Sequence, residues 1–409
     1  MPAFLTHWYV LIETARRSQD AGSDLGSLIV DARTLQRRAP LPAPPQTPPA
    51  GAVWDTGPLP EIDFRFPGSD ISAMAYLGAL APNFGFFQKG LFREKIIKGV
   101  SPRQASDQSP ATTHWAALLH TNRTGDVLRT LLEHIAEIPS PALRSQALAF
   151  AMGYTSHLAT DMALNPCINA LAGAYRDRRQ SLAIHSYIEL CLDEYVAERY
   201  FHHTLHSWTG QPWGQYIEPS ASHMLQPGTL SGQVFDLLMA AAETTYGLSE
   251  VQCQSFQQTQ RMGLRRLRYY LAGRGIFRAL TLYALTRSRQ NDPIAACIAA
   301  HSAENGTTTF EGVLAYAIRL SEHLCRRAIS YYASLRNSSA TASERSQRRA
   351  ALSEDLRNWN LDSGYTLDVT FDQEVTVHLI HNWVHFARFW DVGEGVLPHP
   401  HMITHSPSS

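Results

Sequence analysis

The chain has 409 residues, a formal net charge of -1 at pH 7 and five cysteines. This length suffices for a large core and for either two domains or one enlarged domain. The near-neutral charge removes any general electrostatic case for nucleic acid or an anionic membrane as partner. The cysteines are scattered and form no C-x-x-C pair, which predicts reduced, core-filling thiols and no disulfide framework.

The amino terminus, MPAFLTHWYVLIETARRSQDAG, has no basic start followed by an apolar run, so it does not have the pattern of a secretory signal. The most apolar windows are interrupted by His157 and Asp161 or by arginines, which argues against a transmembrane segment. We therefore expect a soluble cytoplasmic protein.

Residues 4–17 have apolar side chains at helical spacing, which predicts a helix with His7 on or near its inner face. A single histidine in such a position is usually structural. Residues 38–70 are rich in proline and have no sustained period, which predicts a surface insertion with polyproline character and no domain boundary.

An ordered pattern returns at Ile71, and the sequence MAYLGALAPNFGFF predicts a helix that ends near residues 79–81. Pro82 and Gly85 then turn the chain and present Asn83 from the corner.

A second helical run is predicted over residues 111–138, closed by Pro139 and Pro141, with Ser140 as the cap of the following helix. This run contains three histidines, each of which taken alone is a face or cap residue: His114, His120 and His134.

The stretch 153–189 combines apolar residues with two short polar ladders. His157, Asp161 and Asn165 follow one another at four-residue steps, and His185 and Glu189 repeat that step. Residues four apart lie one above the other on a helix, so each ladder would face the interior. Burying such groups costs several kcal/mol unless they are satisfied. The buried groups could be satisfied by hydrogen bonds to one another in the core. They could also bind a divalent cation, for which zinc is suited because its ligands include imidazole and carboxylate.

The second half of the chain predicts further helices, at about 229–247, 251–289, 308–337 and 342–358. Residues 364–379 alternate with a period of two and predict a strand pair or an irregular arm. His381 and His385 are interpreted as structural, and residues 399–409 as a disordered tail.

Five short sequences in this order resemble the bacterial zinc-dependent phospholipase C family: MPAFLTHW, GALAPNFGFF, THW, GYTSHLATDMALNP and HSYIE. The resemblance covers about residues 1–205 with the proline-rich insertion set aside, and NWNLDSGY at 358–365 is similar to a C-terminal extension in the same group. It implies an all-α fold, a helical bundle over 1–205 with a mainly helical extension packed on it over 206–409.

The resemblance also implies up to three zinc ions at the bottom of a cleft. Carried over by position, the ligands of the first ion are His114, His157, Asp161 and Asn83. Asp161 would bridge to a second ion, which His7 would hold together with, in secreted members, the mature amino terminus. His185 and Glu189 would hold another ion, with a histidine expected where this chain has Asn165.

The chain departs from the family pattern at three points. Asn83 replaces an aspartate that would orient or deprotonate the attacking water, Asn165 replaces an imidazole, and only six residues precede His7. Amide oxygens are acceptable to hard cations but poor for zinc. We therefore expect fewer than three zinc ions, or a harder metal in one position, with the His185 and Glu189 site the weaker one.

The resemblance implies a phospholipase C-like, metal-dependent phosphoric ester hydrolase acting on a phospholipid or a small phosphoester, with peripheral membrane contact. Asp161 and Asn83 would be its catalytic positions, and Phe84 would either line a headgroup pocket or pack in the core. Two alternatives stay open: a diverged helical metalloenzyme for a small metabolite, and a non-catalytic scaffold with a partly retained metal site.

Overall fold

The computed structural model describes residues 4–20, 69–87, 115, 118–120, 122–172, 188–189, 192–193, 195–196, 200, 212–271, 310–356, 358–361 and 365–366. The predictions for the proline-rich insertion up to residue 68, for His114, His185, His381 and His385, and for the tail lie outside these residues.

The described part of the chain is almost entirely helical, which confirms the all-α prediction. Its elements are α1 (Phe4–Asp20), α4 (Ser69–Gly78), the 3-10 helix η1 (Ala81–Phe87), α8 (Thr124–Glu137), α9 (Pro141–Ala172), α12 (Pro212–Met224), α13 (Leu230–Tyr246), α14 (Glu250–Leu271), α17 (Phe310–Arg336) and α18 (Ala342–Leu356). Two short strands, β1 (Trp359–Asn360) and β2 (Tyr365–Thr366), form an antiparallel hairpin, so Tyr365 and Thr366 begin the predicted 364–379 arm as a strand.

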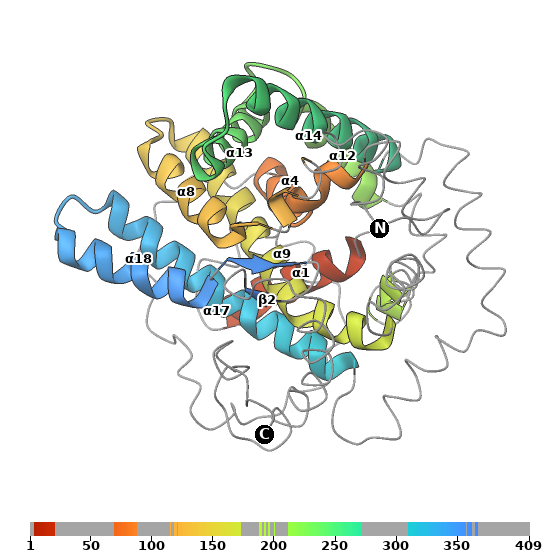
Figure 1. The fold of residues 1–409 in the computed structure, drawn as a ribbon. Helices are drawn as coiled ribbons and strands as arrows, with labels where there is room; N and C mark the ends of the chain where they lie inside the picture. The colour runs from red at the N-terminus through yellow and green to blue at the C-terminus, as the bar shows by residue number, and fades with distance from the viewer. Residues whose placement is uncertain are drawn as a thin grey trace, which may run out of the picture.

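Helix α9 is the centre of the bundle, and α1, α4, α8, α13 and α17 all pack against it (Figure 1). Its contact with α4 is made backbone to backbone. A Cβ on Gly153 would collide with the carbonyl of Ala75, and a Cβ on Gly78 would collide with the carbonyl of Phe150. Only glycine allows this approach. It places the end of α4 and the corner at η1 directly beside the middle of α9.

Helix α1 is buried on nearly every side. Its apolar residues Leu5, Val10 and Leu11 have no exposed surface, and Trp8 donates a hydrogen bond from Nε1 to the carbonyl of Tyr76 at 3.1 Å. The buried residues of this helix include polar side chains such as Thr6 and Glu13, which need partners in the interior. The predicted inner position of His7 is confirmed, since its side chain is 2 % exposed.

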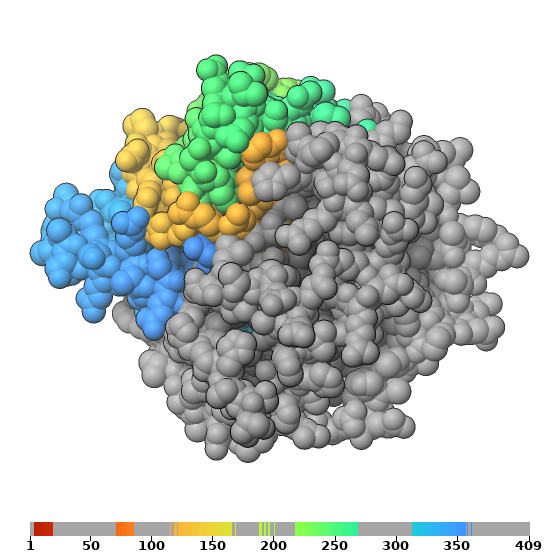
Figure 2. Space-filling model, in the orientation of Figure 1, coloured from red at the N-terminus to blue at the C-terminus, as the bar shows by residue number. Residues whose placement is uncertain are grey.

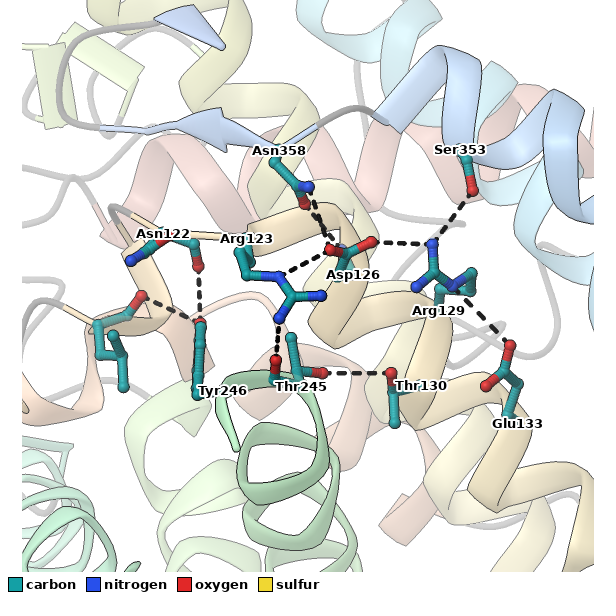
Figure 3. A network of polar contacts seen from close by, with 11 residues as sticks. Asn122, Arg123, Asp126, Arg129, Thr130, Glu133, Thr245, Tyr246, Ser353 and Asn358 are labelled. Atoms are coloured by element: carbon teal, nitrogen blue, oxygen red, sulfur yellow. Dashed lines mark hydrogen bonds and ion pairs between the residues drawn. The ribbon is translucent and has the colours of Figure 1, made fainter. Parts of the chain in front are cut away.

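The predicted continuous helix over residues 111–138 is wrong at one point. Residues 118–120 are helical, but Arg123 has a left-handed backbone (φ 48°) and α8 begins only at Thr124. The hydroxyl of Tyr246 lies 3.1 and 2.7 Å from the carbonyl oxygens of Leu118 and Asn122 and can donate its one hydrogen to either (Figure 3). The Leu118 carbonyl also accepts the helical bond from the N–H of Asn122 at 3.3 Å, so this last turn is complete and the run breaks at Arg123.

Other predicted boundaries agree with the structure where it describes them. The backbone N–H of Leu143 donates to the Ser140 hydroxyl at 3.4 Å, which caps α9 as predicted. Gly247, in the left-handed conformation, ends α13. Helix α14 is described up to Leu271, short of the predicted end. No described helix is long and apolar enough to cross a membrane.

The helices of the second half pack onto those of the first. Helix α17 lies along α9 and α1, and α18 folds back on α17. In the space-filling view α18 projects at one edge of the molecule beside α8 (Figure 2). The division into domains at residues 205 and 206 remains a prediction.

Candidate metal centre

The predicted ladder on α9 is present and buried. His157 has no exposed surface and Asp161 is 6 % exposed. One helical turn separates them, and the Nε2 of His157 lies 3.0 Å from Oδ2 of Asp161. The surrounding face of α9 is built from small and apolar residues, so water has little access to this pair.

His7 reaches the same carboxylate from α1. Its Nε2 lies 3.2 Å from Oδ1 of Asp161, and its ring stacks on that of His157 with centroids 4.0 Å apart. The Nδ1 of His7 has no hydrogen-bond partner within the described chain. Two helices that are separate in the sequence therefore bring two imidazoles to one carboxylate, as the sequence predicted.

A third imidazole comes from His120, which lies just before the break at Arg123. Its side chain is buried, and its Nε2 lies 2.8 Å from Oδ2 of Asp161. The sequence analysis treated His120 as a face residue, and the resemblance pointed to His114, which lies outside the described residues. Both belong to one predicted helical run, so periodicity gave no reason to prefer His120.

The backbone of α4 fixes which nitrogen of His157 carries hydrogen. Its Nδ1 lies 2.7 Å from the carbonyl oxygen of Ala79. A carbonyl can only accept, so Nδ1 is the donor. In the neutral ring Nε2 then has a free lone pair, and this lone pair faces the Asp161 carboxylate at 3.0 Å. Two acceptors so close repel each other unless a proton or a metal ion lies between them.

A proton is the less favourable choice. Burial, together with the neighbouring His7, lowers the pKa of His157 to about 4, although Asp161 opposes this shift. Burial alone would raise the pKa of Asp161, but His157, His7 and His120 together hold it well below its usual value. At pH 7 Asp161 is therefore ionised and the imidazole of His157 is uncharged, which is the ionisation state that metal ligands require.

The ligand atoms are close enough to share one ion. One atom each from His7, His157 and Asp161 lie within 4.8 Å of one another. This is the one group of three or more candidate ligands within the described residues. Imidazole and carboxylate are typical ligands of zinc, so the residues present fit the predicted metal.

Asn83 lies at the edge of this group. Its side chain is 2 % exposed, and its Nδ2 lies 3.4 Å from the Nε2 of His157. The corner at η1 thus presents Asn83 to the site as predicted. The neighbouring Phe84 is fully buried in the core, which agrees with the packing alternative; its role in a headgroup pocket remains a prediction.

The second predicted ladder is not assembled in the part of the chain that the structure describes. Glu189 is helical and half-buried, and His185 lies outside the described residues. Asn165 is buried, and its Nδ2 donates to the carbonyl of Leu361. Its role as a metal ligand remains a prediction.

No family model, no curated protein and no solved structure matches this chain.

Proposed function

We propose that the chain binds a divalent metal ion, zinc by preference, through His7, His157 and Asp161, with His120, whose Nε2 lies beside Asp161, as a fourth ligand. The observation that carries this proposal is the unprotonated Nε2 of His157, which faces the buried Asp161 carboxylate at 3.0 Å while Nδ1 donates to the carbonyl of Ala79. Three imidazoles and one carboxylate form a donor set of charge -1, which suits zinc better than the harder cations.

We further propose that this centre hydrolyses phosphoric esters, with a phospholipid or a small phosphoester as substrate, as in the zinc-dependent phospholipases C that the motifs resemble. A bound zinc ion supplies Lewis acidity toward a phosphoryl oxygen and makes a water molecule more acidic. Asp161 would provide the negative charge that offsets the ion, and the stacked rings of His7 and His157 would each offer one nitrogen beside that carboxylate. Asn83, as a neutral amide, orients groups by hydrogen bonding and removes no proton.

The first experiment measures metal content and hydrolysis together. Purified protein should contain about one zinc by elemental analysis, and should cleave phosphatidylcholine or a chromogenic phosphorylcholine ester. Chelator should abolish cleavage, and added zinc should restore it. Asp161→Ala should lose both metal and activity. The matched control is Asp236→Ala. Asp236 is an exposed residue of α13 that pairs with Arg261 of α14, away from the site. Three tightly held zinc ions per chain, or hydrolysis unaffected by chelator, would contradict the proposal.

Asn83 favours a second candidate function, a metalloenzyme that acts on a small metabolite by other chemistry. An amide stands where the resembling family has a carboxylate, at 3.4 Å from His157. The variant Asn83→Asp separates the two functions. A large gain in esterase activity identifies a weakened phospholipase site, whereas no gain with metal retained favours the second candidate. Chelator-sensitive folding without any turnover would instead identify a scaffold.

A further inference from the structure

The C-terminal hairpin is bonded to the metal centre through the backbone of one residue. Leu361, fully buried after β1, donates its N–H to the carbonyl of His120 at 2.8 Å. Its own carbonyl accepts the hydrogen bond from Nδ2 of Asn165. A residue near the end of the described chain therefore joins the backbone of one proposed ligand to the helix that carries two others.

These bonds close a ring of contacts around the site. Asp161 lies 2.8 Å from the imidazole of His120, the His120 backbone accepts from Leu361, and Leu361 accepts from Asn165. Asn165 closes this chain of contacts, because it lies one turn from Asp161 on α9. Any shift of Leu361 must therefore move the His120 backbone relative to Asp161.

The hairpin has a second attachment at its start. The backbone N–H of Asp126, in the first turn of α8, donates to Oδ1 of Asn358, and Nδ2 of Asn358 donates back to Oδ2 of Asp126, each at 3.1 Å (Figure 3). Asn358 thus caps a helix whose own preceding residue, Arg123, makes no side-chain cap. One attachment is therefore made at His120 itself and the other at the first turn of α8, which follows it.

The hydrogen bond of Asn165 gives its side chain a structural role. Its NH₂ group donates to the Leu361 carbonyl and has no lone pair for a metal ion, so only the amide oxygen could bind one. A carboxylate at position 165 would face the carbonyl oxygen of Leu361, and two acceptors would repel each other. If residue 165 bound the metal ion directly, the same carboxylate would instead raise the affinity for the ion.

We infer that Asn165 is a positioning residue and no metal ligand: it anchors the hairpin at 358–361, and the hairpin holds His120 in place for the metal ion. This inference rests on the proposed metal centre and extends it to the C-terminal part of the chain. It also accounts for an asparagine where the resembling family has a histidine.

The test is Asn165→Asp, which keeps size and shape but removes the donor. The full chain is titrated with Co²⁺, and affinity and the visible absorption band are recorded. Removing a residue that orients a ligand typically costs roughly 10- to 100-fold in metal affinity, so Co²⁺ should bind at least about tenfold more weakly, with a changed band. If Asn165 were a ligand, the new carboxylate would tighten binding instead. Equal or tighter binding overturns the inference.

The control is Asn337→Asp, the same chemical change in the exposed loop between α17 and α18, where the side-chain oxygen accepts from Ser339. It should leave Co²⁺ binding unchanged. If Asn165→Asp does not fold, Asn358→Ala replaces it, because this variant frees the hairpin and keeps every proposed ligand. Weaker Co²⁺ binding then supports the inference, and unchanged binding overturns it.

Hydrogen exchange separates this inference from the proposed function. In metal-free protein, Asn165→Asp should speed exchange of the Leu361 amide, which reports the anchor without any metal. Wild-type protein that binds no Co²⁺ overturns the proposed function, and with it the positioning of a ligand. Wild-type protein that binds Co²⁺ while Asn165→Asp binds as tightly overturns only the inference.

Discussion

Asp193 caps the helix that carries His7: its Oδ1 accepts hydrogen bonds from both the backbone N–H and the hydroxyl of Thr6, each at 2.9 Å. The carboxyl is buried, and burial raises its pKa to about 7 even though the bonds from Thr6 oppose this shift. One buried acid therefore fixes the first turn of α1 and titrates near neutrality.

Asp193→Asn should make the protein less sensitive to pH between about 4 and 7. A carboxyl whose folded pKa is raised contributes stability that is present below its unfolded pKa and is lost as pH rises through the folded value. Wild-type protein therefore loses this contribution to its stability as pH rises over that range, whereas the variant has no carboxyl group at position 193 to titrate. Urea unfolding in chelator, at several pH values, measures the difference. Parallel stability curves for the two proteins would contradict the prediction.

His157 should act in the opposite direction. Its folded pKa of about 4 lies below the ordinary value because of burial, so the unfolded chain takes up a proton first as pH falls below about 6.5. Asp161, with its pKa held below the usual range, adds a loss at still lower pH. The contribution of His157 to the stability of metal-free protein should thus fall toward pH 4. His157→Gln should flatten the part of this decline between pH 6.5 and 4, measured by the same unfolding series.

His120→Ala should weaken zinc binding by more than the roughly 10- to 100-fold typical of residues that only orient a ligand, because it removes a nitrogen 2.8 Å from Asp161. His134→Ala is the matched control, since His134 belongs to the last turn of α8 and is only half-buried. Competition with a chelating dye gives both affinities. Equal affinities would remove His120 from the ligand set.

Gly153→Ala should destabilise the fold by about 1–3 kcal/mol or more, as overpacking of a tight contact does. The added methyl group would meet the carbonyl of Ala75 and separate α4 from α9. Zinc affinity should fall with it, because Ala79 and Asn83 lie on the displaced side. Ser346→Ala, in the exposed part of α18, should change stability by less than about 0.5 kcal/mol. Chemical denaturation measures the free energy of unfolding of both variants, and equal values would contradict the prediction.

Local sequence patterns were sufficient for most of the helices and for half of the site, but they missed α12 and the break at Arg123. The four-residue step from His157 to Asp161 predicted the buried pair on α9, because helical periodicity depends only on near neighbours. The same reasoning placed His7 on the inner face of α1, Asn83 at the corner and the cap at Ser140. Each of these predictions concerns residues within a turn or two of one another.

Only the tertiary structure showed which residues contact the polar side chains of α9. His120 meets Asp161 across 41 residues of chain, and Tyr246, more than a hundred residues away, lies against the carbonyls at the end of the helical turn that carries His120. Asn165 meets the carbonyl of Leu361 at a separation of 196 residues, and Asp193 meets Thr6 at 187. Such contacts depend on how whole helices pack, and no pattern along the chain encodes them. Sequence alone therefore determined which side chains face inward, and packing determined their partners.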